Sequence, residues 1–88
     1  EALGFCGRGE ASDFLKGGGN IAREGMLPLN TNGGQLSGGR THGFGYFYEA
    51  IMQLRGEAGE RQLARRPRVA AVANGGGPLG SCFLLRTD

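Results

Sequence analysis

The hydrophobic positions of the chain form short groups separated by glycine-rich and charged stretches. The clearest pattern lies between residues 44 and 54, where apolar side chains recur at intervals of three, four and three residues: Phe44, Phe47, Ile51 and Leu54. This spacing is typical of one face of a helix, and Gly56 follows where a helix commonly ends. The pattern therefore predicts a helix over residues 45–55 whose apolar face packs against a sheet.

Two apolar runs near the C-terminus predict β-strands. Residues 68–73 and 82–86 are rich in aliphatic and aromatic side chains, and residues 74–81 between them, NGGGPLGS, predict a connecting loop. Val69 to Ala73 are apolar throughout, without alternation, which is typical of a strand buried on both faces. Because one helix cannot cover both faces, we expect further structure to lie against this strand.

The first thirty residues have a less regular pattern. Their apolar start around Leu3 and Phe5 predicts a short strand, and residues 12–15 predict one helical turn. Residues 26–30, MLPLN, predict an extended edge segment, because Pro28 lacks a donor and biases its predecessor toward the β region. Strands combined with one main helix indicate the α/β class, and 88 residues allow one domain at most.

Glycine changes this picture, because 19 of the 88 residues are glycine, whereas average usage is about 7%. The absence of a Gly-X-Y period excludes collagen, and doublets set between apolar runs do not fit a uniformly flexible linker. Many of the glycines lie in residues 33–45 and 75–80. The loop over residues 30–45 is too long for a hairpin turn, and loops of this length in compact domains are usually functional.

This loop leads into the predicted helix and carries candidate chemistry there. Glycines let backbone N–H groups approach a ligand, and a helix N-terminus favours negative charge or a developing oxyanion. His42 and Tyr46 lie at this position as candidate acids or bases, although a surface histidine and a core-edge tyrosine are the plainer interpretations. Residues 75–80 match G-x-G-x-x-G but run into a strand instead of a helix, which excludes a dinucleotide site.

Charge and cysteine content exclude further classes. The net charge is only +2, and the arginines of residues 61–68 lack interleaved aromatics, so we expect no nucleic-acid partner. Cys6, Cys82 and His42 cannot complete a zinc site by themselves, so we expect no metal and two unpaired thiols. No signal-peptide pattern or membrane span is recognisable, and we expect a cytoplasmic protein.

The order of these segments resembles the C-terminal end of the thiolase superfamily. The resemblance rests on the loop, the helix, the run QLRGEAGERQ at residues 53–62 and the glycine-rich connection after the strand, and it extends from about Ala2 to Leu85. It is closest to the sterol-carrier-protein-type and lipid-transfer-protein-like thiolases. It implies that residues 1–88 are a partial thiolase-like C-terminal domain, inactive alone. The N-terminal half of an αβαβα subunit would supply the nucleophilic cysteine and cover the Val69 strand.

The resemblance also implies where the chemistry departs from thiolysis. The family's Gly-His-Pro motif falls on residues 39–41, GRT, so Arg40 replaces the catalytic histidine. The late acid/base residue falls near Ala73, which cannot transfer protons. Together with HGFGY at residues 42–46 and NGGGP at residues 74–78, these departures look like the steroid side-chain aldolases of the superfamily. Those enzymes cleave a β-hydroxyacyl-CoA by a retro-aldol step and work with an OB-fold partner protein.

By this resemblance, the substrate is a sterol- or lipid-derived coenzyme A thioester, no cofactor is tightly bound, and the subunit forms a homodimer. His42 and Tyr46 become the candidates for proton transfer, and Arg40 would pair with a carboxylate or a CoA phosphate. The remaining candidates for binding the substrate and the enolate oxygen are Gly33, Gly34, Asn74, Gly75 and Gly76.

Two alternatives stay open. In the first, the chain is a non-catalytic module that binds lipid or acyl-CoA, or that only assembles with a partner subunit. In the second, it belongs to a conventional acetyl-CoA acyltransferase in which a local shift of the loop gives His42 the role of the missing histidine.

Overall fold

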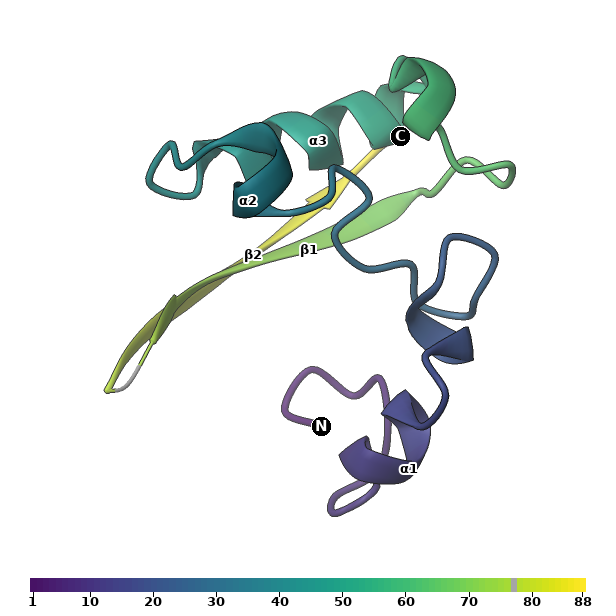
Figure 1. Cartoon of the computed structure of the whole chain (residues 1–88), viewed down its shortest axis with the longest axis vertical. Coiled ribbons are helices and arrows are strands. Elements are labelled where there is room, and N and C mark those ends of the chain that lie inside the picture. Colours follow the sequence, from purple (N-terminus) through teal and green to yellow (C-terminus); the bar gives the residue numbers. More distant parts are fainter. Residues whose placement is uncertain (77) are drawn as a thin grey trace.

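One long helix lies across a two-stranded antiparallel hairpin in the computed structural model of the chain, which describes residues 1–76 and 78–88 (Figure 1). The helix, α3, spans Phe44–Arg55. The hairpin consists of β1, Val69–Gly76, and β2, Leu79–Arg86. Four short helical turns complete the elements: α1 (Ala11–Leu15), η1 (Gly19–Ile21), α2 (Gln35–Gly38) and η2 (Gly59–Arg61). This mixed arrangement confirms the α/β class predicted from the sequence.

The predicted helix is confirmed, and it begins one residue earlier than expected. Gly43 caps its N-terminus in the left-handed region, with φ of 89°, while the Thr41 hydroxyl accepts the N–H of Gly45 at 2.9 Å. At the other end, Gly56 is also left-handed, and the N–H of Glu57 reaches back to a carbonyl in the last turn. The local sequence at both ends therefore supplies the caps that a helix requires.

The two predicted strands are also confirmed, but the connection between them is shorter than expected. Residues 74–81 were predicted to form a loop, whereas Asn74, Gly75 and Gly76 pair with residues of β2, and Gly77 lies outside the described residues. Glycine makes this extension feasible, because a Cβ on Gly75 would collide with the carbonyl oxygen of Leu79. The glycine-rich sequence therefore continues the ladder instead of interrupting it.

The core lies between α3 and one face of the hairpin. Among the described residues, the buried hydrophobic side chains are Leu54, Ala58 and Val72. Phe83 pairs with Val72 in the ladder, and its ring meets that of Phe47 edge to face at 5.1 Å between centroids. The apolar face of α3 is only partly covered, because the Phe44 side chain is 73% exposed.

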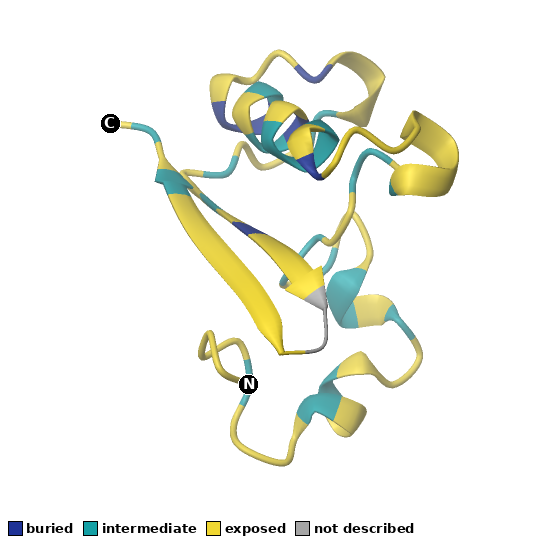
Figure 2. Cartoon of the chain, turned by 90° about the vertical axis from the view of Figure 1, so that its left-hand side faces the viewer, coloured by how far each residue is buried: buried dark blue, intermediate teal, exposed yellow. Residues whose placement is uncertain are grey.

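The opposite face of the hairpin is apolar and bare, which corrects the expectation that the first strand is buried on both faces. Side chains alternate between faces along a strand, and those that point away from α3 are exposed: Val69, Ala71, Ala73, Cys82 and Leu84. Figure 2 shows that the hairpin is exposed along most of its length. Within the described residues, no second layer covers it.

The N-terminal segment, residues 1–29, extends away from α3 and contains no strand (Figure 1). The strand predicted around Leu3 is wrong, since Gly4 closes a turn onto the carbonyl of Glu1, whereas the predicted helical turn is confirmed as α1. Residues 26–30 form no strand either, although Leu27 and Leu29 donate to carbonyls of η1. The Arg23 guanidinium ties this segment to the rest by donating to carbonyls at residues 60 and 62.

No helix in the described part of the chain is long and apolar enough to cross a membrane. Cys6 and Cys82 are both free.

Candidate functional site

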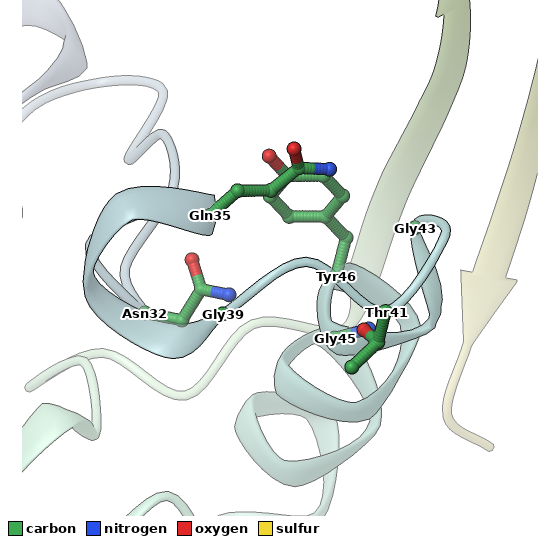
Figure 3. Close-up of a pocket in the computed structure, with 7 residues that line it drawn as sticks. All are labelled: Asn32, Gln35, Gly39, Thr41, Gly43, Gly45 and Tyr46. Atoms are coloured by element: carbon green, nitrogen blue, oxygen red, sulfur yellow. The ribbon is translucent and has the colours of Figure 1, made fainter.

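A small pocket opens at the N-terminal end of α3, between the first turn of this helix and the glycine-rich loop that contains α2 (Figure 3). The residues that line it come from the loop and from the start of the helix: Asn32, Gln35, Gly39, Thr41, Gly43, Gly45 and Tyr46. A phenol, two carboxamides and a hydroxyl therefore converge where the helix presents its positive end.

The loop holds its side of the pocket through short-range hydrogen bonds. The carboxamide oxygen of Asn32 accepts the N–H of Gly34 at 2.9 Å, and Gly33 donates its N–H to the carbonyl of Asn30 at 2.9 Å. Such turns are what Asn-Gly sequences favour. A single helical turn, α2, then carries Gln35 to the pocket (Figure 3).

The second glycine-rich segment meets this pocket from β1. Gly43, which is buried, approaches the side chain of Asn74 so closely that a Cβ at Gly43 would lie 2.8 Å from the Asn74 amide nitrogen. Two segments about thirty residues apart in the sequence thus come together at the helix N-terminus. Glycine at position 43 is favoured both by this contact and by the left-handed backbone.

The predicted site residues do not all occupy the same place. Tyr46 is half-buried and lines the pocket, and Asn74 lies beside Gly43. His42 and Arg40 are exposed and are not among the lining residues, and His42 has a left-handed φ of 51°. The structure thus brings Tyr46 and Asn74 to the N-terminus of α3, whereas His42 and Arg40 are exposed and do not line the pocket.

The four predicted glycines take part in the local framework. The N–H groups of Gly33 and Gly34 are both donated within the loop, so in this conformation they are not directed at a ligand. Gly75 and Gly76 lie in β1, opposite Gly80 and Leu79. They were predicted in a loop, and the pairing of the two strands places them in the ladder.

Sequence reasoning missed three polar residues of the pocket, Asn32, Gln35 and Thr41. The signal for Asn32 was present, because Asn before Gly-Gly favours a turn closed by its own side chain. Thr41 precedes the helix by three residues, where a hydroxyl can accept a free N–H of the first turn. For Gln35 the sequence offers no comparable signal.

A buried carboxylate lies one helical turn beyond Tyr46. The side chain of Glu49 is 7% exposed, and it accepts hydrogen bonds from Thr31, Gln53 and Arg61. Burial raises the pKa of Glu49, but these hydrogen bonds and the positive charge of Arg61 outweigh it and hold the pKa below its ordinary value of 4.5. Glu49 is therefore a fixed negative charge behind the pocket.

These groups can bind and polarise an oxygen-bearing ligand. The helix N-terminus favours negative charge, the carboxamides can donate to it, and the phenol of Tyr46 can exchange a proton. Within residues 1–76 and 78–88, no three His, Cys, Asp or Glu side chains gather in a way that could hold a metal ion. The side chains that line the pocket supply hydrogen bonding and proton transfer.

Comparisons with known proteins agree with the resemblance found in the sequence. Residues 1–85 match the family described as thiolase C-terminal domain-like. The chain is 42% identical over 84 residues to the 17-hydroxy-3-oxo-4-pregnene-20-carboxyl-CoA lyase of Mycobacterium tuberculosis, a match covering 96% of this chain and 21% of the lyase. It is 50% identical over 56 residues to the steroid side-chain-cleaving aldolase of Thermomonospora curvata, covering 64% of this chain and 14% of the aldolase. No solved structure matches it significantly.

Proposed function

Because the chain belongs to the thiolase C-terminal domain-like family, we propose that it forms one wall of an active site that cleaves a carbon–carbon bond in a sterol- or lipid-derived acyl-CoA. The two relatives support this reaction class, since one is named as a steroid side-chain-cleaving aldolase and the other as a lyase of a steroid carboxyl-CoA. The acyl-CoA thioester is the substrate, and the reaction needs no tightly bound cofactor.

The observation that carries this proposal is the position of Tyr46 in a polar pocket at a helix N-terminus. In a retro-aldol step, a base takes the proton of the β-hydroxyl group, and the bond between Cα and Cβ breaks. The electron pair passes to the thioester as an enolate, while Cβ leaves as a ketone or aldehyde. Tyr46 is our candidate for the proton transfer, and the helix N-terminus with Asn32 and Asn74 would stabilise the enolate oxygen.

The other predicted residues have supporting roles in this proposal. His42 is a second candidate for proton transfer, which requires the loop to turn it toward the pocket. Arg40, whose side chain is exposed beside the pocket residue Gly39, would bind a carboxylate or a CoA phosphate. The glycines at positions 33, 34, 75 and 76 would let the backbone approach the thioester.

The bare face of the hairpin supports the proposal that this chain works as part of a larger subunit. A sheet face with Val69 60% and Leu84 71% exposed is costly to leave in water, at about 25 cal/mol for each Å² of apolar surface. We propose that the remainder of a thiolase-like subunit covers it and supplies the opposite wall of the site, so that the chain alone does not turn over. A homodimer, an OB-fold partner protein and a cytoplasmic location are proposed from the family resemblance.

The test is the Tyr46→Phe variant of the full-length protein, which removes only the hydroxyl group. We expect carbon–carbon cleavage to fall by roughly 10²- to 10⁴-fold while acyl-CoA binding, measured by calorimetry, persists. Tyr48→Phe is the matched control, because Tyr48 is 60% exposed and lies outside the pocket. If Tyr46→Phe and His42→Ala both turn over at the wild-type rate, the site assignment is wrong.

Two other functions give different outcomes in the same assay. A non-catalytic binding or assembly module, favoured by Arg40 and Ala73 at two positions where the family has acid/base residues, would bind acyl-CoA without cleaving it. A conventional acetyl-CoA acyltransferase would consume free coenzyme A and depend on His42. Product analysis of the wild-type protein therefore separates the three functions.

A further inference from the structure

The segment QLRGEAGERQ, residues 53–62, takes no part in the proposed reaction but forms a network of hydrogen bonds next to the pocket. Its side chains fold back onto α3 and η2: Gln53 donates to the carbonyl of Arg61 at 2.7 Å, and the N–H of Leu63 donates to the Gln53 carboxamide at 3.0 Å. Gln62 donates to the Gln53 carbonyl at 3.2 Å. Gln53 is itself buried, so its hydrogen bonds hold this segment against the end of α3.

Glu49 joins residues 53–62 to the glycine-rich loop of residues 30–45, which forms one side of the pocket. Its Oε2 accepts the Arg61 Nε–H at 3.0 Å, and its Oε1 accepts the Gln53 amide at 3.1 Å. The same Oε1 accepts the hydroxyl of Thr31 at 2.8 Å. One carboxylate therefore connects the start of the loop, the middle of α3 and the segment beyond the helix.

The fold favours the ionised form of Glu49, but stability does not require a charge at this place. Taking a carboxylate out of water costs several kcal/mol, and well-packed apolar residues in place of a buried ion pair are often as stable or more stable. A buried polar network instead holds its members in one geometry. This network holds Thr31, the residue directly before Asn32 in the sequence, and Asn32 lines the pocket.

The geometry fixes the two sides of the pocket relative to each other. Tyr46 precedes Glu49 by three residues, so both side chains lie on one face of α3, while Thr31 and Asn32 belong to the loop. The bond from Thr31 to Glu49 therefore joins the loop that carries Asn32 to the helix that carries Tyr46.

We propose that Glu49 is a positioning residue of the acyl-CoA site, which acts through Thr31 to hold Asn32 opposite Tyr46; this inference rests on the function proposed above. The carboxylate does not touch the substrate. Its removal, or removal of the Thr31 hydroxyl, loosens the loop while leaving the phenol of Tyr46 in place.

The test uses Thr31→Val in the full-length protein, because valine keeps the shape of threonine without its hydroxyl. We expect kcat to fall roughly tenfold to a hundredfold, as for a small misplacement of a positioned group, with KM changed by no more than about threefold. Thr31→Ser restores the hydroxyl and should recover most of kcat. Thr87→Val is the matched control, because the Thr87 hydroxyl donates to the carbonyl of its neighbour Asp88 and Thr87 does not line this pocket.

A second measurement does not depend on activity. The N–H of Gly34 donates to the Asn32 side chain, so its hydrogen exchange should become faster in Thr31→Val, while exchange of the Thr87 N–H, which donates to the Arg68 carbonyl, stays unchanged. Unchanged exchange at Gly34, or faster exchange with an unchanged kcat, overturns the positioning role. If the wild-type protein cleaves nothing, the proposed function has failed, and exchange at Gly34 alone then decides whether the Thr31 hydroxyl, which bonds to Glu49 and Gln53, orders the loop.

Discussion

Replacing Gly43 with alanine places one methyl group where the two glycine-rich segments of the chain meet. Gly43 has φ of 89°, and its missing Cβ would lie 2.8 Å from the Asn74 amide nitrogen. The substitution therefore has two separate effects, a backbone strain at position 43 and a displacement of the Asn74 carboxamide.

The two effects differ in size and in what they change. An alanine in the left-handed region costs roughly 1–2 kcal/mol, and the unfolding free energy should fall by this amount. Ordinary contact begins at 3.4 Å, so the carboxamide must also move by about 0.6 Å, which is cheap for the end of a side chain but displaces a group at the pocket. A shift of this size should reduce kcat about tenfold, since a 1 Å misplacement can cost about a hundredfold.

Gly59→Ala is the control that isolates the backbone strain. Gly59 is also left-handed, with φ of 61°, but among the described residues nothing beyond its chain neighbours lies within 4 Å of its Cβ position. Denaturant unfolding of the full-length protein should therefore give similar losses for both variants, whereas only Gly43→Ala should lose activity.

A double variant tests the contact directly. In an Asn74→Ala background, the methyl group at position 43 has nothing to displace, so adding Gly43→Ala should leave kcat at the value of Asn74→Ala alone. Such non-additivity is the signature of residues in contact. Equal activities of Gly43→Ala and Gly59→Ala, or an undiminished effect of the methyl group in the Asn74→Ala background, would show that the contact between Gly43 and Asn74 does not affect activity.

Two further predictions concern stability. Leu54→Ala should lower the unfolding free energy, measured by urea unfolding, by about 2–5 kcal/mol, because Leu54 is one of few buried apolar side chains among the described residues. Leu36 is fully exposed, so the control Leu36→Ala should change the unfolding free energy by no more than about 0.5 kcal/mol. The pKa of Glu49 in the folded protein lies below its unfolded value. The contribution of its ionised carboxylate to the unfolding free energy is therefore complete above pH 4.5 and is lost as the pH falls through the folded pKa. Glu49→Gln should therefore flatten this acid-side loss in thermal melts, and an unaltered pH profile would contradict the assignment.

The helix and the strands could be predicted because their signals are local. The apolar spacing of residues 44–54 and the glycine at position 56 specify α3 without reference to the rest of the chain. The hairpin was underestimated, since its end is built from glycines, which carry no strand signal, and its length is set by pairing with β2. The N-terminal strand failed for a related reason, because an apolar run becomes a strand only where a partner strand is available.

The site was predictable only in outline. A glycine-rich loop before a helix indicated where ligand chemistry would lie, and Tyr46 was identified from its place in the first helical turn. Glu49 could not be identified, since a glutamate in an amphipathic helix usually faces water, and its burial depends on Thr31 and Arg61, which are distant in the sequence. Likewise, nothing local indicates that His42 is exposed and does not line the pocket.

The hairpin has a consequence for handling the chain. In the described residues, each strand pairs only with the other, so each keeps one edge whose backbone groups can accept a further strand. The eight residues of β1 carry no charged side chain that would discourage such pairing. The edges that would let this hairpin join a larger sheet would also let two copies template each other, so a chain produced by itself should self-associate through β1 and β2 and stay monomeric only when these edges are occupied.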